Sequence, residues 1–291
     1  MTDKPRFTIL DERGVLAVYG ADSASFLQGL VSNDIEKATP GHAVYAALLT
    51  PQGKYLHDFF VARTEDAYLL DCEQAGLKDL QKRLSMYKLR ADVTLEDRSG
   101  EVAVAAIFGE HSDEVHLEGI AVYADPRLAK AGVRCILPKA EAKGILEKAG
   151  FTPADPTEYD RLRLTLGLPD GTRDLIPEKS ILLENGFDEL NGVDWDKGCY
   201  MGQELTARTK YRGLVKKRLM PVMLAGPPPE PGTPIILGEK EAGELRSCLA
   251  TEDGGIGLAV IRLDALENSG ELQAEGVKVT PEQPDWMVLS E

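Results

Sequence analysis

Short apolar runs, separated by turn residues, recur along this 291-residue chain and limit the folds open to it. The runs are rich in β-branched residues and most end at Gly, Pro, Asp or Asn, which is typical of β-strands. Over the first half they predict strands at residues 6–10, 14–19, 43–50, 55–63, 67–72, 91–97, 101–108, 120–124 and 133–137. Apolar residues at helical spacing predict helices that start at 22 or 23 and that span 74–87, 139–149 and 157–166. Strands that alternate with a few helices favour an α+β fold over a doubly wound one.

The last quarter of the chain has a simpler pattern. A Pro/Gly-rich loop, AGPPPEPGTP at 225–234, excludes both a helix and a central strand there. Around it the sequence predicts strands at 219–224, 234–237, 243–250, 256–261 and 277–280. Short strands at this spacing are typical of a small antiparallel barrel. We therefore expect an α+β region of one or two subdomains over 1–215 and a C-terminal β-barrel over 216–291.

Composition excludes several classes of protein. The chain carries a net charge of −15 and 43% hydrophobic residues, and no apolar run approaches the length of a transmembrane helix. The N-terminal sequence MTDKPRFTIL has no apolar core of signal-peptide length and no Arg/Ser-rich character, so we expect a cytoplasmic protein without membrane contact. Four scattered cysteines and four scattered histidines show no ligand spacing, which predicts neither a disulfide framework nor a bound metal.

The densest chemistry lies in the segment 196–218, DKGCYMGQELTARTKYRGLVKKR. Cys199 follows Lys197 by two residues, and the residues from Tyr200 onward favour a helix that Asp196 can cap. A lysine and a helix N-terminus both lower the pKa of a thiol, so the pattern predicts a reactive thiolate at Cys199. The plainer alternative is a small buried residue, which is the commoner use of a single cysteine.

The second half of that segment is basic. Glu204 and Arg208 are spaced to pair on one helical face. From Arg208 to Arg218 there are six Lys/Arg residues and no acid, which in an acidic chain indicates an anionic ligand or partner. The acidic excess argues against general nucleic-acid binding, although a local RNA contact stays open. The alternative interpretation is a solvated face at a domain junction.

The eight residues KGCYMGQE closely resemble the K-G-C-[YF]-x-G-Q-E signature of the YgfZ family. This is a folate-binding group related to the glycine-cleavage T-protein, an aminomethyltransferase. Weaker matches at FLQGLVSND, LLTPQGKYLHDF and MYKLRADVTLED extend the resemblance over nearly the whole chain. It is strongest toward the branch that contains the mitochondrial factor for iron–sulfur protein maturation. The resemblance implies a T-protein-like fold of mixed and antiparallel sheets, a tetrahydrofolate or related folate ligand, and iron–sulfur client or assembly proteins as partners.

The same resemblance implies which residues hold folate. Tyr159 and Arg163 share one face of the helix at 157–166, where the aromatic ring can stack on a pterin and the arginine can bind a glutamate tail. Glu184 can accept hydrogen bonds from the pterin 2-amino and N3–H groups. In the signature, Gln203 and Glu204 are expected to orient the loop around Cys199. The expected folate-binding residues are Tyr159, Arg163, Glu184, Tyr200, Gln203, Glu204 and Arg208, and the expected catalytic residues are Cys199, Lys197 and Asp58.

Two departures from the T-protein pattern weaken the case for aminomethyl transfer. The chain has His57-Asp58 where those enzymes typically have Asp-Asp, and Thr165-Leu166-Gly167 where they often have Glu-Ala-Gly. A threonine cannot act as a general base as a carboxylate does. Our first hypothesis is a tetrahydrofolate-binding accessory protein for iron–sulfur cluster assembly or repair, which keeps no cluster itself because one thiol is too few. The alternatives are a folate-dependent aminomethyl- or methyltransferase with Asp58 as base, and a scaffold whose basic strip docks an acidic partner or RNA.

Overall fold

The structure is a computed structural model that describes residues 4–110, 112, 117–268 and 270–289. Two compact units can be distinguished in it. The first unit consists of Met1–Pro51, Leu56–Tyr159 and Asn191–Gln203, and the second of Gln52–Tyr55, Asp160–Leu190 and Glu204–Glu291. The second unit therefore contains the segments 160–190 and 204–215 as well as the barrel that was expected over 216–291.

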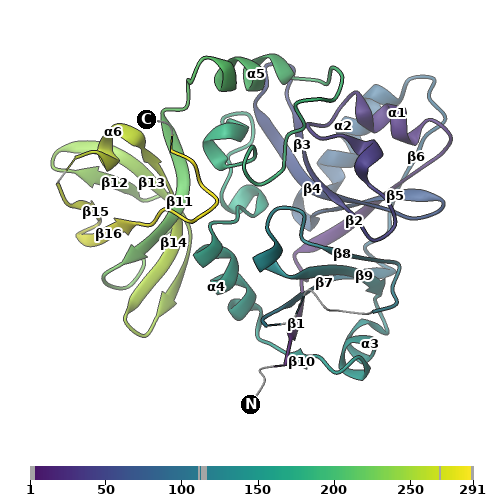
Figure 1. Cartoon of the computed structure of the whole chain (residues 1–291), viewed down its shortest axis with the longest axis horizontal. Helices are drawn as coiled ribbons and strands as arrows, with labels where there is room; N and C mark the ends of the chain where they lie inside the picture. The colour runs from purple at the N-terminus through teal and green to yellow at the C-terminus, as the bar shows by residue number, and fades with distance from the viewer. Residues whose placement is uncertain (1–3, 111, 113–116, 269, 290–291) are drawn as a thin grey trace. The chain divides into compact units, whose positions relative to one another are not determined.

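One five-stranded sheet organises most of the first unit (Figure 1). Its strands lie in the order β3 (Val44–Leu49), β4 (Tyr55–Arg63), β5 (Ala67–Glu73), β2 (Arg13–Tyr19) and β6 (Thr94–Asp97). Two helices, α1 (Ser23–Gln28) and α2 (Leu77–Lys88), pack their apolar residues into the core of this sheet. Short 3-10 helices lie beside them at Ile35–Lys37 and Gln74–Gly76.

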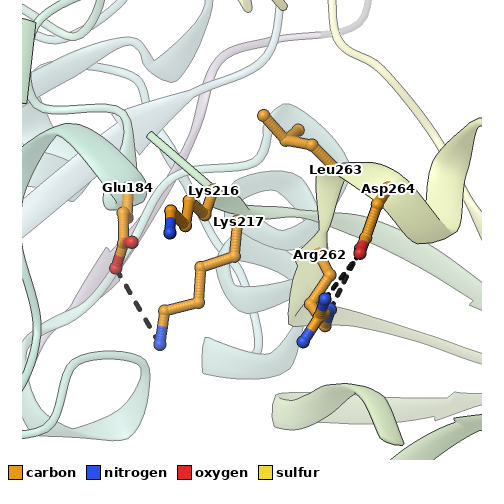
Figure 2. Close-up of a pocket in the computed structure, with 6 residues that line it drawn as sticks. All are labelled: Glu184, Lys216, Lys217, Arg262, Leu263 and Asp264. Carbon is orange, nitrogen blue, oxygen red and sulfur yellow. Dashed lines mark hydrogen bonds and ion pairs between the residues drawn. The ribbon is translucent and has the colours of Figure 1, made fainter. Parts of the chain in front are cut away.

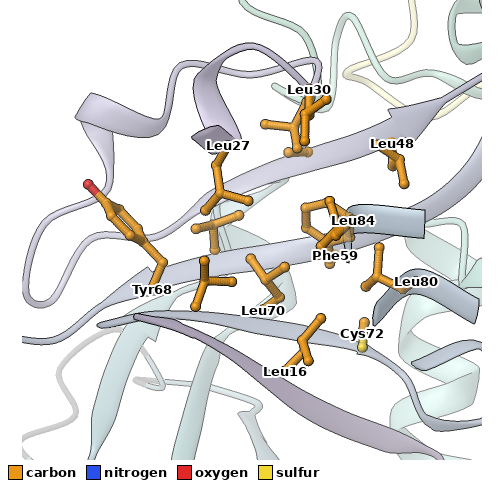
Figure 3. Packing of buried hydrophobic residues seen from close by; sticks show 14 of the residues in the cluster. Leu16, Leu27, Leu30, Leu48, Phe59, Tyr68, Leu70, Cys72, Leu80 and Leu84 are labelled. Carbon is orange, nitrogen blue, oxygen red and sulfur yellow. The ribbon is translucent and has the colours of Figure 1, made fainter. Parts of the chain in front are cut away.

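The core of this sheet is apolar, with mostly aliphatic side chains and a few aromatic ones (Figure 3). Leu80 and Leu84 of α2 lie one helical turn apart and contact the same cluster as Leu27 of α1 and Phe59 of β4. Burying each of these side chains stabilises the fold by about 1.5–3 kcal/mol. The face predicted for the helix at 74–87 is therefore the face that the structure buries.

A second five-stranded sheet completes the first unit. Its order is β10 (Thr152–Pro153), β1 (Arg6–Ile9), β7 (Val102–Phe108), β9 (Val133–Pro138) and β8 (Ala121–Ala124), covered by α3 (Ala142–Lys148). A 3-10 helix at Ala129–Ala131 precedes β9. Strand β10 pairs in parallel with β1, whereas β1, β7, β9 and β8 pair antiparallel. The two-residue β10 was missed from the sequence because it is too short to show a period.

A buried ion network joins the two sheets of the first unit. The carboxylate of Asp71 on β5 accepts hydrogen bonds from Arg13 on β2 at 2.7 Å and from Arg134 on β9 at 2.6 Å. Burial by itself would raise the pKa of Asp71, but the two guanidinium groups outweigh it and hold the pKa below its ordinary value. Both arginines also lie over the ring of Phe60. Asp71 thus connects a side chain of β2 in one sheet with a side chain of β9 in the other.

The second unit contains a closed antiparallel barrel. Its strands lie in the order β11 (Lys217–Leu224), β14 (Gly254–Arg262), β13 (Lys240–Thr251), β12 (Pro234–Leu237), β15 (Leu272–Ala274) and β16 (Val277–Pro281). Helix α6 (Leu263–Leu266) follows β14, and the 3-10 helices Gly171–Arg173 and Leu182–Asn185 precede the barrel in the chain. Helix α4 (Pro156–Leu166) ends in this unit, and α5 (Gln203–Tyr211) leads to β11. The α+β fold class with a C-terminal antiparallel barrel is confirmed, although β15 and α6 were missed.

Candidate functional site

The segment around Cys199 presents the one exposed thiol among the four cysteines, all of which the structure describes. Cys72 and Cys135 are buried in strands, and burial raises the pKa of each thiol to about 12. Cys248 is half-buried, and burial raises its pKa as well. Because the thiolate is the reactive and metal-binding form, these three cysteines are unsuited to chemistry at neutral pH. Cys199 is the accessible thiol of the chain.

Lys197 anchors the loop that carries Cys199. Its ammonium donates to three backbone carbonyl oxygens at and after the C-terminal end of α1, those of Gln28 at 2.9 Å, Val31 at 2.7 Å and Asn33 at 2.7 Å. Burial lowers the pKa of Lys197 to about 8, against the opposing charges of two nearby aspartates. The expected action of the Lys197 charge on Cys199 stays a prediction. The three N–H groups of Lys197 also hold the loop in place, and the sequence does not reveal this structural role because the acceptors lie more than 160 residues away.

Four further hydrogen bonds fix the same loop. The backbone N–H of Met201 donates to the carbonyl of Gly29 at 3.1 Å, and that of Tyr200 donates to the side-chain oxygen of Gln203 at 3.1 Å. Asp194 accepts from the backbone N–H groups of residues 196 and 197. Helix α5 begins at Gln203, so the expectation that Asp196 caps a helix from Tyr200 is wrong. Gln203 performs the orienting contact at the start of that helix.

Two polar side chains that also hold this region were not predicted from the sequence. Asn33 donates from its side chain to the backbone carbonyls of Tyr45 and Asn191, both at 2.7 Å. Ser32 donates to the carbonyl of Gly192 at 2.6 Å. These residues lie in FLQGLVSND, a segment whose resemblance to the family was the only available signal. The polar end of this segment therefore holds the chain just before the Cys199 loop.

Two of the expected folate contacts are used inside the fold. Arg163 is 4% exposed, and its guanidinium donates to Asp160 at 2.6 Å, to Asp174 at 2.8 Å and to Ser247 at 2.9 Å. A glutamate tail therefore finds its donors already engaged, which corrects the expectation for Arg163. Tyr159 is buried against Phe108, with ring centroids 5.5 Å apart, and its hydroxyl accepts a hydrogen bond from Arg134 at 3.3 Å.

Glu184 lies in a pocket of about 630 Å³ in the second unit (Figure 2). The residue is 8% exposed, and within the described chain its carboxylate has one close partner, Lys217, at the long distance of 3.8 Å. Burial raises the pKa of Glu184, and Lys217 and Lys54 only partly offset it. A buried carboxylate has several acceptor positions that favour N–H donors. Glu184 is thus placed to accept hydrogen bonds from a ligand in the pocket, which Lys216, Lys217, Arg262, Leu263 and Asp264 also line.

Half of the cations in the basic strip from 208 to 218 are paired within the second unit. Lys210 contacts Asp188 at 2.9 Å, and the buried Arg218 contacts Glu189 at 2.6 Å. Together with Lys217 and Glu184, these pairs neutralise half of the six cations with acids from the segment 184–189. Glu204 and Arg208 are exposed on α5, where a ligand can reach them. The strip is therefore a weaker attractor of anions than its sequence suggests.

Asp58 is buried in the first unit. Tyr45 donates its hydroxyl proton to the carboxylate of Asp58 at 2.8 Å, and burial followed by the Asp58 charge raises the pKa of Tyr45 well above its ordinary value. The neighbouring His57 contacts Asp79 at 2.9 Å. No cluster of three or more metal-binding side chains, and no helix long and apolar enough to cross a bilayer, is present among the residues that the structure describes.

Two parts of the chain match known protein families. Residues 10–126 match the GCVT N-terminal domain, and residues 216–289 match the C-terminal beta-barrel domain of CAF17. The glycine cleavage system aminomethyltransferase T from Bartonella henselae has the same fold, with a TM-score of 0.76 over 98% of this chain and 86% of that one. Its sequence is 14% identical, so this likeness concerns the fold alone.

Curated relatives are more similar in sequence. The chain is 34% identical to the mitochondrial iron–sulfur cluster assembly factor IBA57 of Mus musculus and 33% identical to that of Homo sapiens. Each alignment covers 95% of this chain and 84% of the relative. These relatives carry the IBA57 name, so the YgfZ label, which names a related family, is not confirmed. They are also named as mitochondrial proteins, which contradicts the expectation of a cytoplasmic protein.

Proposed function

Because the chain belongs to the IBA57 family of iron–sulfur cluster assembly factors, we propose that it supports the assembly of iron–sulfur clusters in other proteins, with Cys199 as its reactive group. The observation that carries the role of Cys199 is its exposure on a loop that Lys197 clamps with three hydrogen bonds. A clamped loop presents a thiol at a defined position, whereas a free loop would not.

The chemistry of a single thiol limits what Cys199 does. A thiolate is a ligand for iron in clusters, and stable clusters in proteins usually take four such ligands. Cys72, Cys135 and Cys248 are not exposed, so they offer no further ligands at the Cys199 loop. The cluster is therefore cargo of the reaction, and the protein that receives or delivers it supplies the remaining ligands.

Tetrahydrofolate is the proposed small ligand, and the open carboxylate of Glu184 supports it. The GCVT-like fold is folate-related, and the pterin edge presents adjacent N–H donors that match a carboxylate. The lysines beside Glu184 would face the negative groups of such a ligand. Of the other expected contacts, Tyr200, Gln203, Glu204 and Arg208 stay proposals, whereas Arg163 holds the fold.

The proposed role is tested by removing the protein from its host. Cells that lack it should lose the activity of iron–sulfur enzymes, while enzymes without clusters keep theirs. The metal content of an iron–sulfur client purified from these cells should fall in parallel. Normal clusters in the client would contradict the assembly role, whatever the outcome of folate binding.

A further inference from the structure

The end of helix α2 exposes an unusual amount of apolar surface. Met86 is 58% exposed, Tyr87 is 39% exposed and Leu89 is 90% exposed. We refer to these three residues as the α2 apolar cluster. Elsewhere in the described part of the first unit, Ile120 is the one large hydrophobic residue that is exposed. Apolar residues that gather in this way on an otherwise polar surface mark an interaction site more often than scattered ones do.

Leu89 has a second unusual property. Its backbone adopts φ 44° and ψ −106°, a conformation that glycine adopts at no cost and that a bulky side chain disfavours. The leucine therefore strains the backbone and gains no burial within its own unit. Stability of the first unit does not explain a leucine at this position, whereas contact with another molecule does.

A pocket of about 470 Å³ lies against this cluster. Tyr87, Leu89 and Ala91 line it, together with Phe26 of α1 and Leu30, which follows α1. Leu30 continues into the buried core of the unit, beside Leu27 and Leu84 (Figure 3). The pocket thus offers a preformed apolar floor for an inserted side chain.

Helix α2 and its C-terminal end, which form part of the pocket, are basic, whereas the pocket also contains one acid, Asp22. Residues 78–90 contain five cations, Lys78, Lys82, Arg83, Lys88 and Arg90, and a single acid, Asp79. Asp79 contacts Arg83 and His57, so it is engaged. Lys88 and Arg90 line the pocket itself. In a chain of net charge −15, this local excess of positive charge favours an acidic partner.

The pocket is also connected to the Cys199 loop. Gly29, which lines the pocket, accepts the hydrogen bond from the backbone N–H of Met201. Gln28, the preceding residue, accepts from the ammonium of Lys197. A molecule seated in the pocket therefore touches the segment that holds the reactive loop in place.

We propose that the α2 apolar cluster and its pocket dock a partner protein through an acidic segment that inserts apolar side chains. A second copy of this chain is disfavoured, because a twofold interface would bring Lys88 and Arg90 against their own copies. A membrane is disfavoured because the apolar surface surrounds a concave pocket that also contains the carboxylate of Asp22. That the partner carries an iron–sulfur cluster rests on the proposed function, whereas the docking surface does not.

The docking surface is tested with two synthetic helical peptides that share leucines at i, i+3 and i+7 and differ in having either Glu or Lys elsewhere. The acidic peptide should bind the full chain, with affinity that falls as salt rises, and the basic peptide should not. Leu89→Ser should weaken the acidic peptide about tenfold or more, because one apolar anchor is lost. Lys88→Glu with Arg90→Glu should weaken it as well. Ile120→Ser is the matched control and should change nothing.

Several results would overturn this proposal. They are equal binding of the two peptides, no binding of the acidic one, or an unchanged affinity in Leu89→Ser. A dimer in sedimentation that Leu89→Ser dissolves would identify a second copy as the occupant, and Leu89-dependent binding to anionic phospholipid vesicles would identify a membrane. Leu89→Gly should fold at least as stably as the parent, and a clear loss of stability would give Leu89 a structural role. Cys199→Ser should leave peptide binding intact, so failure of docking and failure of the assembly role can be told apart.

Discussion

The ammonium of Lys197 lies 2.7 Å from the backbone carbonyl oxygen of Asn33, a residue 164 positions earlier in the chain. Together with the contacts to Gln28 and Val31, this bond ties the signature segment to the end of α1. The lysine of the KGC sequence thereby supports the position of the thiol two residues later.

Replacement of Lys197 by methionine should destabilise the first unit. Three carbonyls lose a charged donor at a half-buried site, so we expect the free energy of unfolding to fall by about 2–4 kcal/mol. Urea denaturation followed by circular dichroism measures the change. Lys148→Met, at an exposed position in α3, is the matched control and should change stability little. Equal stability of Lys197→Met and the parent would show that the clamp contributes nothing.

Arg163→Ala should damage the second unit far more than a neighbouring substitution does. It leaves the fully buried carboxylate of Asp174 without its guanidinium, and breaking a buried pair in this way typically costs about 3–5 kcal/mol. Arg161→Ala removes an exposed arginine from the same helix and is the matched control. Thermal unfolding of the two variants separates the outcomes. A stable Arg163→Ala variant that binds folate weakly would restore the ligand role expected from the sequence.

Much of the fold was open to prediction because its signals are local. The strand at 55–63 and the barrel strand at 234–237 have the bounds that periodicity indicated. The role of Arg163 was not open to prediction, because the spacing of Tyr159 and Arg163 does not reveal Asp174 and Ser247 as partners. The same holds for Lys197. Its acceptors are backbone carbonyl oxygens, which every residue has, so the sequence does not show where they lie. Local sequence patterns therefore predicted helices and strands. Whether a candidate site residue is available to a ligand depends on polar contacts with residues far away in the sequence.

Acid should weaken the first unit through Asp71. Its pKa lies below the ordinary value in the fold, so its ion pairs contribute stability above the unfolded pKa of about 3.9, and this contribution is lost as pH falls through the folded pKa. Asp71→Asn leaves Arg13 and Arg134 without their carboxylate and should be much less stable than the parent at pH 7. Urea denaturation at pH 7 and pH 3 measures the free energy of unfolding of both proteins. The difference between the parent and Asp71→Asn should be smaller at pH 3. If the difference in the free energy of unfolding is the same at both pH values, Asp71 is not the group whose protonation weakens the first unit in acid.

Tetrahydrofolate affinity should depend on Glu184. Glu184→Gln removes the charged acceptor for the pterin donors and should weaken binding by about 1.5–3 kcal/mol in calorimetry. Asp264→Asn is the matched control, because Asp264 lines the same pocket but is exposed and paired with Arg262. Unchanged affinity in Glu184→Gln would remove Glu184 from the folate site.

Thiol labelling should rank the cysteines by exposure. With a limiting amount of a maleimide reagent at neutral pH, Cys199 should label first, Cys248 later, and Cys72 and Cys135 last. Mass spectrometry of partially labelled peptides gives the order directly. If a buried cysteine reacts as fast as Cys199, the fold opens more readily than its packing implies.

The most direct test of the central claim is complementation with two variants side by side. Cys199→Ser and Asp58→Asn are each expressed at the parent level in cells that lack the protein, and the activity of an iron–sulfur enzyme is measured. We predict that Asp58→Asn restores the activity and that Cys199→Ser does not. The opposite result, with Cys199→Ser active and Asp58→Asn inactive, would contradict a thiol-based assembly role. It would favour a folate-dependent transferase that uses the Asp58 carboxylate.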